Sequence, residues 1–198
     1  EAKKKGLKVY IKYFDDFLVK RLIKDHNKFD VIFSANTITH ISNFNSVFYN
    51  VSRIMSDNGT FIIEEPSLLE TIKKNSYDQF YNEHIYVFST IALQNILKKN
   101  NLEIYDVENI KVHGGSNRYY IKKIKNKKIK ISRRFKKNVI SEKKFGLHKF
   151  SCYKNFSKKV KRSKTKLTEI FKKLKRDNKK IIGYGASAKA VTIINYCN

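Results

Sequence analysis

The sequence predicts an α/β fold with a largely parallel sheet, followed by a basic helical segment and the first β-loop-α unit of a second domain. Three observations carry this prediction. Short runs rich in β-branched and aromatic residues alternate with helical patterns through the first half of the chain. A lysine-rich stretch with helical periodicity fills most of the second half. Residues 180–188 then read as a strand that enters a glycine turn.

The first elements alternate as this fold requires. Residues 7–11 are a short strand candidate, and residues 16–28 carry apolar side chains at the spacing of an amphipathic helix. Residues 29–36 then read as a buried central strand with a polar end. Open α/β sheets bind ligands at the carboxyl ends of such strands, so we expect a binding site there.

The first half continues with two more helices and three more strands. We expect a helix over residues 45–55, a turn at 56–59 and a strand at 60–63. That strand ends at Glu64-Glu65-Pro66, because proline cannot continue a central ladder. The last expected elements are a helix at residues 90–99 and a pair of strands at 102–110 and 118–124.

The positive charge is concentrated in one segment. The 198 residues carry a net charge of +26, and residues 122–180 account for +23 of it. Lysines outnumber arginines by 36 to 7, whereas arginine is the preferred reader of bases. We expect a long amphipathic helix with a lysine-coated wet face, and not a specific nucleic-acid surface, because the aromatic residues lie at core spacing. Its apolar positions are Phe150, Tyr153, Phe156, Val160, Leu167, Ile170, Phe171 and Leu174.

Other composition signals exclude several classes. No apolar run approaches the ~20 residues of a membrane span, and there is no signal-peptide pattern. Two cysteines, Cys152 and Cys197, are too few to suggest a zinc site, so we expect no metal site and a cytoplasmic protein with reduced thiols. The sequence starts without Met and ends just after a glycine motif, and we therefore expect a fragment of a longer chain.

Four motifs carry candidate chemistry. Residues 183–188 read G-x-G-x-x-A, whose glycines let a helix N-terminus approach a diphosphate, although a helix packed closely on a strand gives the same pattern. Residues 81–86 place a carboxylate beside His84, a pairing suited to acid-base work but also common at surfaces and in cores. The other two motifs are the polar loops at residues 36–40 and 113–118.

In this order, the motifs resemble the sugar C-methyltransferase family. The segments concerned are ANTITH (35–40), DNGTFIIEEP (57–66), FYNEHIYVFS (80–89), VHGGSNR (112–118) and GYGASAKA (183–190). Members are S-adenosylmethionine-dependent enzymes that methylate a ring carbon of nucleotide-linked keto-deoxysugars. They consist of an N-terminal zinc-binding module, a class I methyltransferase domain and a C-terminal Rossmann-like domain.

The resemblance implies three parts in this chain. Residues 1–124 would be the C-terminal part of the methyltransferase domain, 125–179 a basic helical connection, and 180–198 the start of the C-terminal Rossmann-like domain. The glycine-rich cofactor loop and the zinc cysteines would lie in the missing N-terminal part. We therefore expect these residues alone to bind S-adenosylmethionine poorly, and micromolar binding in a calorimetric titration would refute this.

The resemblance also implies roles for individual residues. His84 is the expected base, which removes a proton α to a ketone. Tyr81 and Glu83 would contact the sugar or polarise its carbonyl, and His40 would lie across the pocket. Asn82 stands where many members carry another histidine. The implied cofactor contacts are Phe14, Asp15, Ala35 and Asn36. The implied substrate contacts are Gly114, Ser116, Gly183, Gly185 and Lys189.

Three other interpretations remain open at this point. The chain could belong to a class I methyltransferase that acts on oxygen or nitrogen of another small molecule. It could be a nucleic-acid-binding module that uses residues 122–180, in which case binding would fall steeply with salt. It could also be a non-catalytic binder of nucleotide sugars, which the intact Tyr81, Glu83 and His84 make less attractive.

Overall fold

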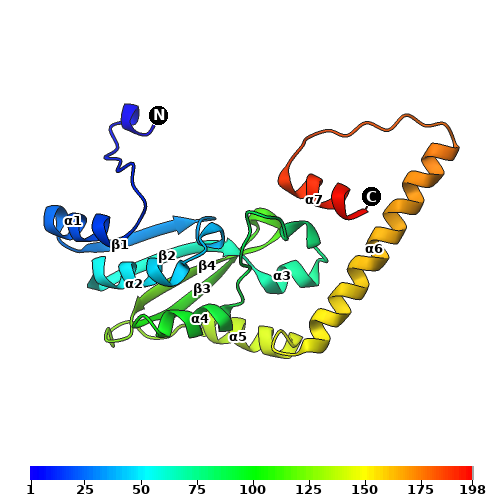
Figure 1. Cartoon of the computed structure of the whole chain (residues 1–198). Coiled ribbons are helices and arrows are strands. Elements are labelled where there is room, and N and C mark those ends of the chain that lie inside the picture. Colours follow the sequence, from blue (N-terminus) through cyan, green and yellow to red (C-terminus); the bar gives the residue numbers. More distant parts are fainter. Residues whose placement is uncertain (198) are drawn as a thin grey trace.

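The computed structural model describes residues 1–197, which form a four-stranded sheet with helices packed on it and one long helix that leaves it (Figure 1). The strands are β1 (Phe29–Ala35), β2 (Met55–Pro66), β3 (Leu102–Ile110) and β4 (Ser116–Lys123), in the order β1-β2-β4-β3. β1 and β2 are parallel, whereas β4 is antiparallel to both of its neighbours. The predicted α/β class is confirmed, but the sheet is mixed and not largely parallel.

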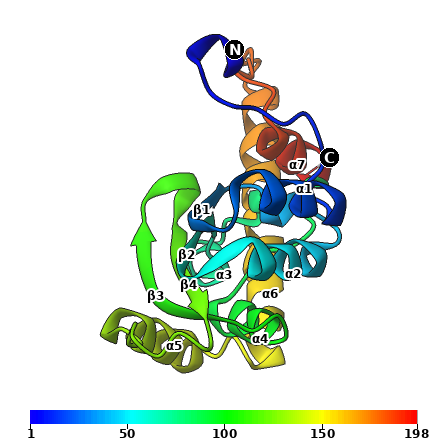
Figure 2. The ribbon, with the colours of Figure 1, turned by 90° about the vertical axis from the view of Figure 1, so that its left-hand side faces the viewer.

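Helices α1 (Asp16–His26), α2 (Phe44–Ile54) and α4 (Thr90–Lys98) lie together on one face of the sheet (Figure 2). Each begins at a side chain that accepts a hydrogen bond from a backbone N–H in the first turn. All three were predicted within two residues of their ends. The largest fully buried apolar side chains of the core are Ile38, Phe48, Met55, Phe61, Ile63, Leu93, Leu97, Leu102, Ile104, Tyr119 and Ile121.

The segment after β2 holds structure that the sequence did not indicate. It forms α3 (Leu68–Lys73) and the 3-10 turn η3 (Tyr77–Gln79), and it leads into an irregular loop at residues 80–87. A second short 3-10 turn, η2 (Ile38–His40), follows β1. These short turns position the loops at the carboxyl ends of β1 and β2.

The turn predicted at residues 56–59 is instead a bulge inside β2. Phe29 pairs with Met55 and Val31 with Thr60, so four residues of β2 stand opposite Asp30. Gly59 allows the bulge to close, because a β-carbon there would lie 2.7 Å from Cγ of Met55 and 3.0 Å from the carbonyl oxygen of Phe29.

Two predicted strands are wrong. Residues 7–11 and 180–182 have no regular structure, and they are largely exposed. A strand needs a neighbour for its N–H and C=O groups, and neither segment pairs with a strand within residues 1–197. The helix expected near Lys189 is present as α7 (Ala188–Cys197).

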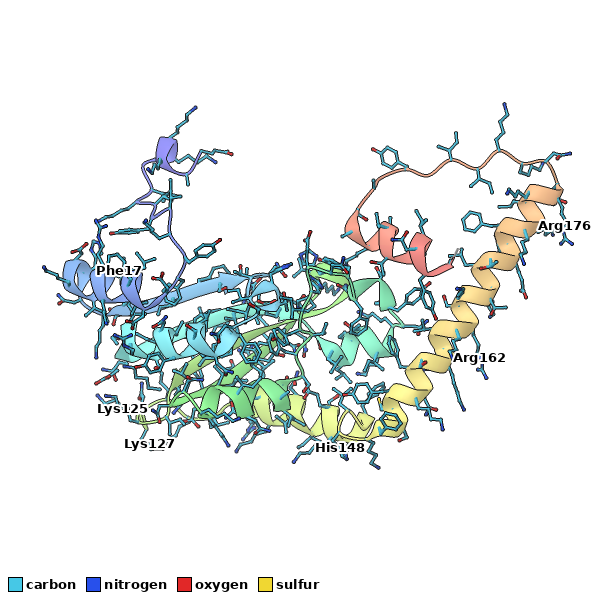
Figure 3. All side chains as sticks on the ribbon, in the orientation of Figure 1. Phe17, Lys125, Lys127, His148, Arg162 and Arg176 are labelled. Atoms are coloured by element: carbon cyan, nitrogen blue, oxygen red, sulfur yellow. The ribbon has the colours of Figure 1, made fainter. Side chains whose placement is uncertain are left out.

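The basic segment forms two helices. The predicted long helix is α6 (Phe150–Arg176), and α5 (Arg133–Phe145), which was not predicted, precedes it. Gly146, in the left-handed region with φ of 88°, ends α5. Figure 3 shows Arg162 midway along α6 and Arg176 at its end, well beyond the sheet. Within residues 1–197, no helix has the length and apolar character needed to cross a membrane.

Candidate functional site

Tyr81 and His84 form a hydrogen-bonded pair in the loop after η3. The Tyr81 hydroxyl lies 2.7 Å from Nε2 of His84, and the two ring centroids are 4.0 Å apart. Nδ1 of His84 lies 2.9 Å from the backbone carbonyl oxygen of Gln79. A carbonyl oxygen only accepts, so Nδ1 carries the proton in the neutral ring. Nε2 is therefore the basic atom, and it accepts the hydrogen bond from the Tyr81 hydroxyl.

His40 faces the same imidazole from the end of η2. The His40 and His84 rings meet edge to face, with centroids 5.1 Å apart. The two loops are joined by the backbone, since the N–H of Ile85 donates to the carbonyl oxygen of Thr39 at 3.0 Å. The structure thus brings together three of the four residues expected to be catalytic.

The surroundings of His84 keep its ring neutral. Partial burial lowers the pKa of the His84 imidazole, and the nearby His40, Lys189 and His113 lower it further, while the Gln79 carbonyl opposes them. A neutral ring with a free lone pair on Nε2 can take a proton from a weak acid.

The Tyr81 phenol is a hydrogen-bond donor in this arrangement. Burial raises its pKa, and the negative charge of Glu83 raises it further. The Glu83 side chain itself is exposed. Tyr81 therefore keeps its proton and can donate it either to Nε2 of His84 or to an oxygen of a bound molecule.

A cavity of about 550 Å³ lies between this loop and α7. One wall holds Tyr81 and Glu83, and the opposite wall comes from the glycine motif and the helix that follows it. Figure 1 shows α7 beside the sheet end of the molecule, next to α6. The residues of α7 and its approach that line the cavity are Ala186, Ala188, Val191, Thr192, Asn195 and Tyr196.

The residues of the glycine motif differ in placement. Lys189 lies near enough to His84 to affect its pKa. Gly183 and Gly185 lie in the irregular, exposed segment before α7, and a β-carbon at either would contact nothing within 4 Å. The close helix-on-strand packing that would offer a purely structural reason for these glycines is absent from the described residues.

Ser116 and Gly114, the two expected substrate contacts near β4, already have hydrogen-bond partners within the chain. Ser116 is only 2% exposed, and its hydroxyl donates to the carbonyl oxygen of Val112 at 3.1 Å. Gly114 is exposed, and its carbonyl oxygen accepts from Nζ of Lys74 at 2.5 Å. A direct role in substrate binding remains a prediction for both.

The expected cofactor contacts lie on two segments. Ala35 and Asn36 are half-buried at the carboxyl end of β1, and Asn36 adopts a left-handed φ of 48°. Phe14 packs partly against the core, and one carboxylate oxygen of Asp15 caps α1 by accepting from the N–H of Leu18 at 2.8 Å. An amide at the carboxyl end of a strand suits the polar groups of S-adenosylmethionine, and an aromatic side chain suits its adenine. The residues present therefore fit part of such a site.

Sequence reasoning missed three residues of this site. Gln79, 3% exposed, places its backbone carbonyl on His84, and its side-chain amide donates to the carbonyl oxygen of His113 at 2.6 Å. His113 was read only as part of a polar loop. Glu65, fully buried, was read as the end of a strand. Within residues 1–197, no three His, Cys, Asp or Glu side chains gather as metal ligands.

Comparisons with known proteins identify the family of the chain. The sequence model of a family described as "Methyltransferase domain" matches residues 4–107, and that of the "C-methyltransferase C-terminal domain" matches residues 111–198. Among curated proteins, C-methyltransferase NovU of Streptomyces niveus is 24% identical over 172 residues, which are 87% of this chain and 41% of NovU. The chain thus spans about two fifths of the length of this relative.

The chain also overlaps in part with two solved structures. An S-adenosylmethionine-dependent methyltransferase from Clostridium acetobutylicum gives a TM-score of 0.45 at 15% identity, over 61% of this chain and 67% of that one. Magnesium protoporphyrin IX methyltransferase from Synechocystis, with bound SAH, gives 0.37 at 14% identity, over 48% of this chain and 44% of that one.

Proposed function

Because the chain belongs to the methyltransferase-domain family, which its residues 4–107 match, we propose that it forms the catalytic part of a C-methyltransferase. S-adenosylmethionine supplies the methyl group when bound, with Ala35, Asn36, Phe14 and Asp15 as the residues that would hold it. The acceptor is a ring carbon of a nucleotide-linked keto-deoxysugar. The hydrogen bond between His84 and Tyr81, which lines the cavity, is the observation that carries this proposal.

The geometry supports carbon methylation because it supplies a base. A carbon next to a ketone becomes nucleophilic only after it loses a proton, and neutral Nε2 of His84 accepts that proton. Before that step the Tyr81 hydroxyl must leave Nε2. It then donates to the ketone oxygen and stabilises the negative charge that develops there. His40 completes the polar wall beside the ring.

The nucleotide-sugar assignment draws on the second wall of the cavity. The glycine motif precedes α7, and a helix N-terminus attracts an anion; Ser187 already accepts from the N–H groups of Ala190 and Val191, so Ala188 and Lys189 would supply the N–H groups for an anion. Lys189 adds a positive charge near His84. A ligand that spans from Tyr81 to this helix end therefore carries a negative group at one end and a ketone at the other. A sugar linked to a nucleotide diphosphate has this form.

Proton exchange tests the role of His84. Because the chain spans only part of its relative, exchange is measured in a protein that also carries the remaining segments. With the keto-sugar nucleotide in heavy water, wild type exchanges the α-proton for deuterium, and His84→Ala loses at least ~100-fold in the exchange rate. His148→Ala is the matched control, because this exposed histidine lies in the turn between α5 and α6 (Figure 3).

Unchanged exchange in His84→Ala would show that His84 is not the base. Methyl transfer without any exchange in wild type would instead favour methylation at oxygen or nitrogen, which needs no carbon acid. Both outcomes are read by proton NMR of the sugar, because deuterium removes the signal of the α-proton.

A further inference from the structure

A buried carboxyl group is hydrogen-bonded to the turn that ends at His40, one of the two histidines of the site. Glu65, near the end of β2, is 0% exposed. Its Oε1 accepts hydrogen bonds from two consecutive backbone N–H groups, those of Thr37 at 3.1 Å and Ile38 at 2.7 Å. These groups open η2, the turn that ends at His40. Thr37, at the N-cap position, makes no side-chain capping hydrogen bond. Glu65, on the neighbouring strand β2, accepts these hydrogen bonds in its place.

The contacts continue from this turn to His84. Thr39, also 0% exposed, follows the two capped residues, and its carbonyl oxygen accepts from the N–H of Ile85 at 3.0 Å. Ile85 adjoins His84. The Glu65 side chain is therefore linked to both histidines. It anchors the turn that ends at His40, and Thr39 in that turn is hydrogen-bonded to Ile85, the neighbour of His84.

Two atoms at this junction have unused hydrogen-bonding capacity. Oε2 of Glu65 and Oγ1 of Thr39 are both buried, and neither meets a hydrogen-bond partner of ordinary geometry within residues 1–197. The Thr39 side chain nevertheless lies close enough to Glu65 to lower its pKa, against the larger effect of burial, which raises it. Because an unmade buried hydrogen bond is costly, we expect the Thr39 hydroxyl to donate to the Glu65 carboxyl group in solution.

We propose that Glu65 is a positioning residue that holds His40 and His84 edge to face by anchoring the turn at residues 37–39. Its importance for turnover rests on the proposed function. Its effect on the geometry does not, because the arrangement of the rings is measurable without substrate. No other described side chain accepts from the N–H groups of Thr37 and Ile38.

The chain contains a matched control. Glu142 on α5 is also 0% exposed, and its carboxylate accepts from two consecutive N–H groups, those of Thr90 at 2.7 Å and Ile91 at 3.1 Å. It caps α4 with both of its carboxylate oxygens, and among the described residues it accepts no hydrogen bond from η2 or from the loop at residues 80–87. Substitution at either position removes one buried cap, so general destabilisation is comparable.

The experiment compares ring contacts by NMR in the chain labelled at histidine. Wild type shows an NOE between the His40 and His84 rings and a proton on Nδ1 of His84. Glu65→Leu loses the NOE, whereas Glu65→Gln keeps it, because the amide oxygen still accepts both N–H groups and the amide nitrogen donates to Thr39. Glu142→Leu keeps the NOE. If Glu65→Leu does not fold, Glu65→Asp decides, because the shorter side chain withdraws the acceptor and also loses the NOE.

Three results would overturn the proposal: an NOE that persists in the folded Glu65→Leu or Glu65→Asp variant, its loss in Glu65→Gln, or its equal loss in Glu142→Leu. The proton-exchange rate of Glu65→Leu, with rescue in Glu65→Gln, then connects geometry to catalysis. Absence of exchange in wild type counts against the proposed function and leaves the NOE comparison unaffected.

Discussion

The His84 imidazole is held in its neutral form by its surroundings, and Lys189 is one of the charges responsible. A nearby positive charge disfavours imidazolium, so its removal favours the protonated form. We predict that Lys189→Ala raises the pKa of His84 towards its ordinary value. A proton NMR titration of the histidine ring signals measures this change, with Lys127→Ala in the distant loop after β4 as the control (Figure 3).

The lowered pKa of His84 also determines how this residue makes stability depend on pH. The pKa of His84 is lower in the folded chain than in an unfolded one, so below the ordinary value of 6.5 the unfolded chain binds more protons. This contribution to stability is present above that pH and is lost as the pH falls.

An unaltered His84 titration in Lys189→Ala would show that Lys189, which follows the glycine motif, does not affect the proposed base.

At the residue scale, the sequence indicated the side chains to which we propose chemical roles, but not the residues that hold them in place. Tyr81 and His84 lie in one short sequence motif, and His40 lies in a second one. Gln79 acts through its backbone carbonyl, which any residue has. Glu65 acts through N–H groups 27 and 28 positions away, and only the pairing of β1 with β2 brings them together.

Among the glycines, Gly59 in the β2 bulge leaves the least room for a β-carbon. A β-carbon at Gly59 would lie 2.7 Å from Cγ of Met55, which is fully buried, and 3.0 Å from a backbone oxygen of β1. We predict that Gly59→Ala destabilises the fold by about 1–3 kcal/mol, as overpacking does elsewhere. Urea denaturation measures the free energy of unfolding.

Gly183→Ala is the control for this substitution. A β-carbon at Gly183 would meet nothing within 4 Å, so the change is expected to stay within about 0.5 kcal/mol. Equal effects of the two substitutions would mean that the bulge relaxes to accept a methyl group.

Helices with an apolar repeat over several turns were predicted well. Strands were predicted poorly where their formation depends on a neighbouring strand. The helices α1, α2, α4 and α6 repeat an apolar pattern over several turns, which a sequence displays directly. Residues 7–11 and 180–182 have strand-like composition, but a strand forms only beside a partner. The glycine in the sequence Ser56-Asp57-Asn58-Gly59 indicates an irregularity without telling a turn from a bulge.

At the scale of the whole molecule, the two regions matched by family models share one sheet. The first match ends at residue 107, inside β3, and the second begins at residue 111, directly after β3. Yet β4 lies between β2 and β3 and pairs with both. The α5 helix also packs against β3, since Arg134 pairs with Asp106 and Phe135 packs against the core. The family boundary is therefore not a folding boundary.

We predict that residues 1–110 alone do not fold. Without β4, the edges of β2 and β3 lose their ladders, and Tyr119 and Ile121, both fully buried, leave the core. Residues 1–148 retain β4, α5 and the Glu142 cap on α4, so they unfold cooperatively. Circular dichroism during urea denaturation distinguishes the two, since only the longer piece shows a sigmoidal transition. A cooperative transition in residues 1–110 would show that β1, β2 and β3 form a stable sheet without β4.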